Sequence, residues 1–309
     1  MTKIATREAY GQALADLGDE IKDIVVLDAD LSGSTKTSMF AKKFPERFFN
    51  IGIAEQDLMG TAAGFATCGK IPFASTFAIF ATGRAFEQVR NSICYPKLNV
   101  KVAATHAGLT VGEDGATHQS VEDLALMRSV PNMTVINPAD AVEAKKAVRA
   151  AALYEGPVYL RFGRFEVETV FNDDYKFEIG KGSVLRKGRD VAIIATGIMV
   201  IEALKAAEIL KNEGLDAMVV NISTLKPIDE DIILDAAKCK AIVTAEEHSV
   251  IGGLGSAVAE VLSEKMPNPM YRVGIRDQFG QSGKPEELLK LYHLTAQDIV
   301  EAAKMVKNR

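Results

Sequence analysis

Short apolar segments alternate with longer amphipathic segments along most of the chain. The apolar segments have the length and composition of buried strands, and in the first half they lie at 24–27, 70–75, 100–105, 133–136 and 158–161. Between them, apolar residues recur at helical spacing over 7–17, 58–67, 83–93 and 139–152. Asp140, shortly after Pro138, is placed to start the last of these helices. This alternation predicts a parallel sheet covered by helices.

The alternation stops between Phe165 and Arg189, where the chain is polar, charged and without helical period. It resumes with strands predicted at 191–195, 217–221 and 241–245, a helix at 199–212 and a turn at Pro227. Gly252-Gly253-Leu254-Gly255 is predicted to open another helix, its glycines serving close helix–sheet packing, since the full dinucleotide fingerprint is missing. We therefore predict an α/β fold of two consecutive parallel-sheet domains, residues 1–168 and 189–309, joined by a linker at 169–188.

Composition narrows the class of protein. With 48% hydrophobic and 25% charged residues the chain is typical of soluble globular proteins. A net charge of -5 gives no reason to expect nucleic acid or an anionic membrane as a partner. Three cysteines without a CxxC pair indicate neither a disulfide framework nor a zinc site. The first residues lack the apolar core of a signal peptide, and no run reaches the ~18 apolar residues of a membrane span, so a cytoplasmic location is expected.

The most distinctive stretch, HAGLTVGEDGATHQ, runs from His106 to Gln119. It follows a predicted strand, and two of the chain's four histidines bracket its glycines and acids. Loops that follow parallel strands carry ligand-binding groups, glycine lets a ligand approach the backbone, and histidine moves protons near neutral pH. By itself the stretch is also consistent with a polar surface loop that carries two incidental histidines.

Two further segments are weaker signals. Glu55, in IAEQD, opens a helix rich in small residues, a position where the helix dipole also favours an acid. Phe77 and Phe80, in STFAIF, follow a predicted strand at a spacing that also suits a core aromatic pair. Each segment has an ordinary explanation when it is taken singly.

Taken together and in this order, these segments resemble the pyrimidine-binding domain of transketolase. The resemblance continues through NPAD (137–140) and GPVYLRFGR (156–164), and the region from Val191 onward is similar to the transketolase C-terminal domain. It implies a thiamine diphosphate pyrimidine-binding domain followed by that second domain. The implied activity is that of a transferase in the pentose phosphate pathway, which moves a two-carbon ketol unit from a ketose phosphate to an aldose phosphate.

The family's diphosphate-binding motif is missing from the chain. Enzymes of this type hold the diphosphate and a divalent metal, Mg²⁺ or Ca²⁺, through GDG followed by an asparagine, whereas the nearest match, Glu113-Asp114-Gly115, belongs to the histidine loop. The resemblance therefore implies the C-terminal subunit of a split transketolase, with no metal ligand of its own. An N-terminal subunit carrying GDG…N would bind the metal, and the two chains would associate as α2β2 around thiamine diphosphate.

By the resemblance, Glu55 donates a hydrogen bond to N1′ of the cofactor pyrimidine, which sustains the tautomer that removes the C2 proton. Burial against Phe77 and Phe80 is expected to favour the neutral carboxylic acid that can donate. Phe80 would stack on the pyrimidine, Phe77 would wall the pocket and Asp30 would lie near the cofactor. Gly83 stands where the family often has a tyrosine.

The substrate-facing positions implied by the resemblance are His106, Asp114, His118, Arg164, Arg7 and Ser34. The two histidines would bind sugar hydroxyls or the carbonyl and assist proton transfer, and Asp114 would accept a hydrogen bond from the hydroxyl beside the carbonyl. Arg164 would grip the sugar phosphate, with Arg7 and Ser34 as further phosphate contacts. A surface salt bridge is the alternative role for Arg164.

Three alternatives are weighed against this interpretation. The β subunit of a 2-oxo acid dehydrogenase shares the layout and a comparable glutamate but lacks a GEDGATHQ-type loop. A 1-deoxyxylulose-5-phosphate synthase shares the loop but normally occurs as one long chain. A non-catalytic partner protein would keep the fold, yet it would have no need of Glu55, Asp114 and both histidines.

Overall fold

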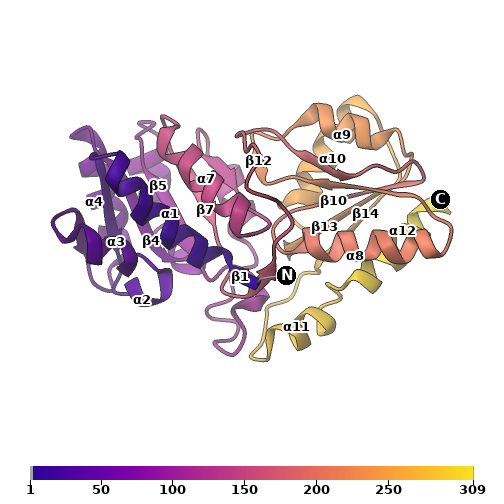
Figure 1. Ribbon diagram of the computed structural model, residues 1–309, viewed down its shortest axis with the longest axis horizontal. Coiled ribbons are helices and arrows are strands. Elements are labelled where there is room, and N and C mark those ends of the chain that lie inside the picture. The colour runs from indigo at the N-terminus through magenta and orange to yellow at the C-terminus, as the bar shows by residue number, and fades with distance from the viewer. Residues whose placement is uncertain (1–2, 309) are drawn as a thin grey trace.

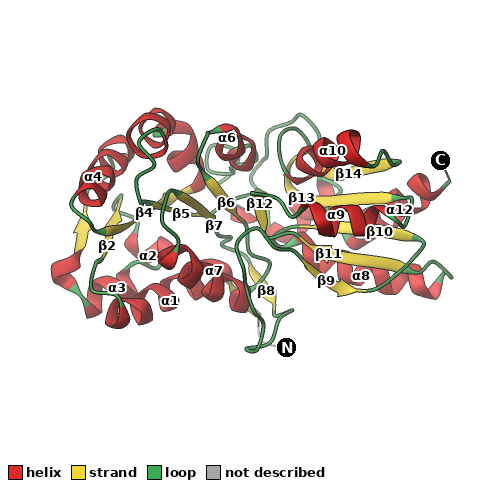
Figure 2. Ribbon diagram, turned by 90° about the horizontal axis from the view of Figure 1, so that it is seen from above, coloured by secondary structure: helices red, strands yellow, loops and turns green. Residues whose placement is uncertain are grey.

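A computed structural model describes residues 3–308 of the chain. The N-terminal half, drawn in indigo to magenta, lies beside the C-terminal half, drawn in orange to yellow (Figure 1). Each half has a mostly parallel sheet with helices on both of its faces (Figure 2). The predicted class, two consecutive α/β domains, is therefore confirmed. No helix in the described range has the length and apolar character needed to cross a membrane.

The first half is built around a seven-stranded sheet of order β12-β6-β7-β5-β4-β2-β3. Its own strands are β2 (Ile24–Asp28), β3 (Phe48–Asn50), β4 (Ile71–Phe77), β5 (Lys101–Thr105), β6 (Thr134–Ile136) and β7 (Val158–Arg161), while β1 (Lys3–Ala5) and β8 (Glu166–Glu168) pair separately. Its helices are α1 (Thr6–Glu20), α2 (Ser32–Thr35), α3 (Ser38–Lys43), α4 (Glu55–Thr67), α5 (Phe86–Gln88), α6 (Asp123–Ser129) and α7 (Ala141–Leu153).

Local sequence explains most of these elements. β2, β5 and β7 are buried along their whole length, as expected of central strands covered on both faces. The predicted start of α7 is also observed, because the Asp140 side chain accepts a hydrogen bond of 2.8 Å from the backbone N–H of Glu143. In Figure 2, α4 and α6 cover one face of this sheet, and α1, α3 and α7 cover the other.

The helix predicted over 83–93 is interrupted. Two π-helical segments, Phe80–Arg84 and Val89–Cys94, flank the short helix α5. Each is marked by a backbone hydrogen bond that spans five residues, from Ala85 N–H to the Phe80 carbonyl (3.1 Å) and from Tyr95 N–H to the Arg90 carbonyl (3.0 Å). A π-helical turn holds an extra residue, so side chains after Phe80 rotate away from their α-helical directions.

The second half contains a five-stranded sheet of order β14-β13-β10-β11-β9. Its strands are β9 (Ser183–Arg186), β10 (Val191–Ala195), β11 (Ala217–Asn221), β13 (Ile242–Ser249) and β14 (Met270–Ile275), and its helices are α8 (Met199–Asn212), α9 (Glu230–Ala237), α10 (Leu254–Lys265), α11 (Pro285–Leu291) and α12 (Ala296–Lys307). The predicted glycine-opened helix is α10. A Cβ on Gly253 would lie 1.9 Å from Glu246 Oε2, which confirms that close packing requires glycine there.

Two strands differ from the sequence-based expectation. β9 lies within the range 169–188 expected to be linker, and it pairs antiparallel with β11 as an edge strand of the second sheet. β12 (Thr224–Lys226), beside the predicted Pro227 turn, pairs antiparallel with β6 of the first sheet. The second half therefore contributes a strand to the sheet of the first.

Buried polar contacts also join the two halves. The Arg161 guanidinium donates to Asp123 through Nε (2.7 Å) and Nη2 (3.2 Å), and its Nη2 donates to the Glu247 carbonyl at 3.1 Å. Glu247 Oε1 accepts from the Thr110 backbone N–H at 2.6 Å, so β13 holds the histidine loop. Gly108 (φ +84°) permits this approach, because a Cβ there would lie 2.3 Å from the Glu247 carboxyl carbon.

Candidate active site

The candidate site lies at the carboxyl edge of the first sheet. β5, β4 and β2 are parallel neighbours, so the loops that follow them meet at one edge. Phe77 ends β4 and His106 directly follows β5. This topology gathers side chains that are far apart in the sequence.

Glu55 begins α4 and is 2% exposed. Its two carboxylate oxygens accept hydrogen bonds of 2.9 and 2.8 Å from Nη1 of Arg84. The expected burial of Glu55 is observed, and its carboxyl group has Arg84 as its hydrogen-bond partner. A hollow of about 430 Å³, lined by residues 53–57 and Arg84, opens beside the pair.

An aromatic platform connects Glu55 to the histidine loop. Phe77 and Phe80 are nearly parallel with ring centroids 5.9 Å apart, and His106 stacks on Phe77 at 3.8 Å. His118 meets Phe80 edge-on at 5.4 Å, and the Arg84 guanidinium carbon lies 4.4 Å from the Phe80 centroid. The three separate sequence signals therefore meet in one series of contacts, in which Arg84 joins Glu55 to Phe80.

His106 is held as a neutral ring. Burial, reinforced by the positive charges of Arg7 and Arg164, lowers the pKa of His106 to about 3. Arg7 Nη1 lies 3.1 Å from His106 Nε2, and Thr105 Oγ1 lies 2.8 Å from Nδ1. Because a guanidinium only donates, Nε2 accepts and Nδ1–H donates to Thr105. The backbone of His106 has φ +57°, a conformation that a non-glycine residue keeps only where its surroundings hold it.

Cationic groups gather beyond His106. Arg7 donates to the Ser34 carbonyl at 2.9 Å, and burial together with the charge of Arg164 lowers the Arg7 pKa. Arg164 Nη1 lies 3.2 Å from Asp114 Oδ2, with both side chains 38% exposed. Among residues 3–308, Arg7 Nε is a buried donor that finds no acceptor. An anion placed there would satisfy it.

The other predicted residues are less central. Asp30 is exposed and exchanges hydrogen bonds with Asn50, at 2.8 and 3.1 Å, rather than facing the aromatic platform. Ser34 reaches the cluster through its carbonyl, by way of Arg7. A Cβ at Gly83 would meet no atom within 4 Å, so the missing aromatic leaves open space. The described part of the chain holds no group of three or more His, Cys, Asp or Glu that could bind a metal.

The C-terminal half clamps the histidine loop. Buried Gln119 donates to the carbonyls of Leu109 and Gly112, both at 3.1 Å, and to that of Gln281 at 2.9 Å. Ser282 Oγ donates to the Glu113 carbonyl at 2.7 Å. The loop's shape therefore depends on both domains.

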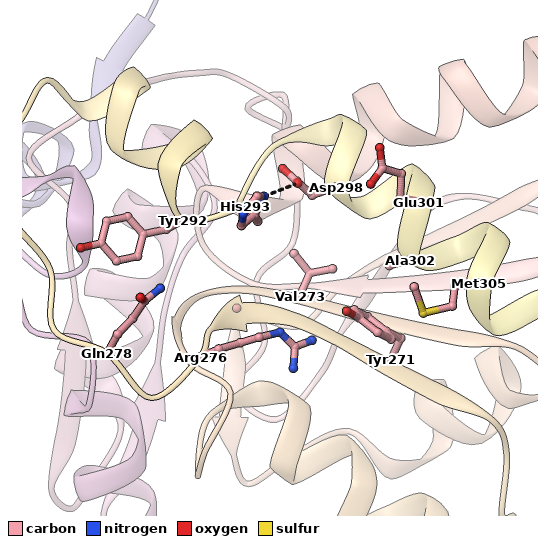
Figure 3. Close-up of a pocket in the computed structure, with 11 residues that line it drawn as sticks. Tyr271, Val273, Arg276, Gln278, Tyr292, His293, Asp298, Glu301, Ala302 and Met305 are labelled. Atoms are coloured by element: carbon pink, nitrogen blue, oxygen red, sulfur yellow. Dashed lines mark hydrogen bonds and ion pairs between the residues drawn. The ribbon is translucent and has the colours of Figure 1, made fainter.

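A second hollow lies in the C-terminal domain, between β14, the following loop and α12 (Figure 3). It measures about 220 Å³, and its His293–Asp298 pair, at 3.2 Å, is satisfied internally. Arg276 lies over the Tyr271 ring at 5.0 Å. The described residues show no convergence of free polar groups there comparable to the histidine loop, which remains the better candidate.

Arg84 is the residue that sequence reasoning missed. It lies 29 positions from Glu55 in the chain, within a segment predicted to be a regular helix. No motif marks it, because its contact depends on the π-helical turn and on the packing of α4 against β4. The nearby Phe80, whose ring the Arg84 guanidinium lies over, is a local signal for it.

Comparison with known proteins places the chain in a family. Residues 2–169 match the family model for the transketolase pyrimidine-binding domain, and residues 180–299 match the model for the transketolase C-terminal domain. The chain belongs to the transketolase family, whose members depend on thiamine diphosphate, and its two domains are those of a transketolase C-terminal section.

Particular relatives make the likeness more specific. The chain is 55% identical to a putative transketolase C-terminal section of Methanocaldococcus jannaschii, over 96% of this chain and 94% of that protein. It is 40% identical to transketolase of Rattus norvegicus, over 98% of this chain but 49% of that protein. A solved structure described as a split gene transketolase, inactive beta4 tetramer, shares 62% identity with a TM-score of 0.93 and 99% coverage of both chains.

Proposed function

We propose that this chain is the C-terminal subunit of a two-chain transketolase, transferring a two-carbon ketol unit from a ketose phosphate to an aldose phosphate. The observation that carries the proposal is the series of contacts that runs from Glu55 by way of Arg84 to Phe80, Phe77, His106 and Arg7. It brings an acid, an aromatic platform, a histidine and a cationic group together in one site.

The residues present fit the pyrimidine end of thiamine diphosphate. Glu55 is a buried acid with a hollow beside it, and Arg84 links it to the Phe80 ring. Phe80 offers a face on which a planar ring can stack. When bound, the cofactor supplies the nucleophilic carbon that the protein lacks. Glu55 would donate a hydrogen bond to the pyrimidine, and Phe77 would exclude water from one side.

The remaining side chains suit a sugar phosphate. Arg7 and Arg164 would bind the phosphate, since Arg7 carries an unsatisfied donor and guanidinium groups match that anion. Asp114 would accept from a substrate hydroxyl after releasing Arg164. His118, which is partly exposed, would move protons, while neutral His106 would position hydroxyl groups.

The diphosphate and its Mg²⁺ or Ca²⁺ would be held by an N-terminal subunit with a GDG…N motif, in an α2β2 assembly. Support comes from the relative described as a C-terminal section and from the transketolase of Rattus norvegicus, of which this chain spans 49%. We place the enzyme in the pentose phosphate pathway of the cytoplasm.

Reconstitution tests the proposal. The purified chain alone should bind thiamine diphosphate poorly and show no ketol transfer, and mixing it with the GDG-bearing chain should restore both. In the mixture, Glu55→Gln should lower kcat by orders of magnitude and slow C2–H exchange of the cofactor, followed by NMR. Glu20→Gln, at the exposed ion pair with Arg149, is the matched control. Full turnover by the isolated chain, or unchanged exchange in Glu55→Gln, contradicts the proposal.

A further inference from the structure

Arg84 occupies the Glu55 carboxyl group and the face of the Phe80 ring, the two groups that the cofactor pyrimidine would use in the candidate site. Its Nη1 donates to both oxygens of Glu55, and its guanidinium carbon lies 4.4 Å from the Phe80 centroid. A guanidinium is planar and stacks on aromatic faces. The group is therefore bonded at its edge to the acid while it lies over the ring, which is the arrangement proposed above for the pyrimidine.

The backbone of Arg84 is anchored, whereas the end of its side chain is free to leave. Gln56 Nε2 of α4 donates to the Arg84 carbonyl at 3.1 Å, and the π-helical bond from Ala85 to Phe80 encloses the residue. The Arg84 side chain is nevertheless 49% exposed, against 2% for Glu55. Rotation about the side-chain bonds can move the cation into solvent without unfolding the segment.

The two occupants exclude each other. One face of Phe80 and one edge of Glu55 cannot hold a guanidinium and a heteroaromatic ring at the same time. In the pair, each carboxyl oxygen of Glu55 already has Arg84 as its partner, so the edge that would face the pyrimidine is taken.

We propose that Arg84 is a removable substitute for the cofactor pyrimidine: it closes the site of the unliganded chain and is displaced when the aromatic ring of thiamine diphosphate stacks on Phe80. This inference rests on the proposed function, because it concerns the same pocket. The apparent affinity for the cofactor is then weaker than the intrinsic affinity, because only the molecules in which Arg84 has left the site can bind it. Freeing the site should tighten the apparent Kd.

Calorimetric titration of thiamine diphosphate into the assembled two-chain enzyme measures this effect. Arg84→Met should tighten Kd by about 5- to 30-fold, as expected for an open site that is otherwise a minor state. Arg84→Lys, which keeps the charge, should change it much less. Arg90→Met is the matched control, because Arg90 is an exposed arginine of the neighbouring π-helical segment that bonds to Asn91. Circular dichroism checks that each variant is folded.

A second measurement needs no substitution in the measured protein. In the ¹⁵N-arginine NMR spectrum, the Arg84 guanidinium, assigned by its absence in Arg84→Met, should show slow proton exchange in the unliganded enzyme. Saturating thiamine diphosphate should abolish that protection. Unchanged or weaker binding in Arg84→Met, or protection that persists with cofactor, overturns the inference. If Glu55→Gln still abolishes turnover, the proposed function stands without it, whereas no cofactor binding by any assembled variant overturns both.

Discussion

Replacing Asp123 by alanine is expected to leave the Arg161 guanidinium buried without its counter-charge. Asp123 is fully buried and Arg161 is 4% exposed. The carboxylate accepts three hydrogen bonds, from Arg161 Nε (2.7 Å), from Arg161 Nη2 (3.2 Å) and from the Tyr159 hydroxyl (2.7 Å). After the substitution, Arg161 keeps its bond to the Glu247 carbonyl, while Tyr159 loses its acceptor.

Breaking one side of a buried ion pair costs about 3–5 kcal/mol. For domains of this size each kcal/mol lowers Tm by about 2–4 °C, so Asp123→Ala should lower it by on the order of 10 °C. Asp235→Ala is the control, because Asp235 pairs with Lys238 on an exposed helix surface, where such a pair contributes about 0–1 kcal/mol. The double variant Asp123→Leu with Arg161→Met should recover most of the loss, since it removes both charges.

Thermal unfolding followed by circular dichroism, with urea denaturation as a second probe, measures these differences. Because two domains are present, transition midpoints are compared rather than a single free energy. A Tm for Asp123→Ala within 2 °C (roughly 1 kcal/mol) of the Asp235→Ala value would refute the assignment of this pair as a stabilising contact.

Two further predictions concern pH and substrate phosphate. Burial raises the pKa of Glu247 from 4.5 to about 7. The protonated side chain therefore contributes up to about 3 kcal/mol to the free energy of unfolding below pH 4.5, and this contribution is lost as the pH rises through 7. Glu247→Gln should therefore flatten the fall of Tm between pH 4.5 and 7.5; a variant whose Tm falls in parallel with the wild type would show that another group is responsible. Arg164→Ala in the assembled enzyme should lower kcat/KM for phosphorylated sugars about 10- to 100-fold, chiefly through KM, and change hydroxypyruvate turnover little. Arg149→Ala, at the exposed ion pair with Glu20, is its control, and equal losses on both substrates would reject the phosphate role.

The local sequence pattern was sufficient to predict most of the regular helices and strands. The apolar run at 191–195 is β10, and the helical period at 199–212 is α8 with the same limits. Asp140 caps α7 as its sequence neighbours predict. These features depend on residues within a few positions of each other, so hydrophobic period and capping chemistry reveal them. The sequence pattern did not predict β9 and β12, because a short edge strand is defined by the strand it pairs with and carries little hydrophobic pattern of its own.

The sequence by itself determined the two α/β domains, the family resemblance and the acid, aromatic and histidine motifs, because each is carried by contiguous residues. Only the tertiary structure decided how these motifs behave electrostatically. Glu55 meets Arg84, His106 is kept neutral beside Arg7, and Glu247 holds the histidine loop from the other domain. Charge state depends on burial and on neighbours brought close by sheet order and by a π-helical turn, and neither is encoded at a fixed spacing along the chain.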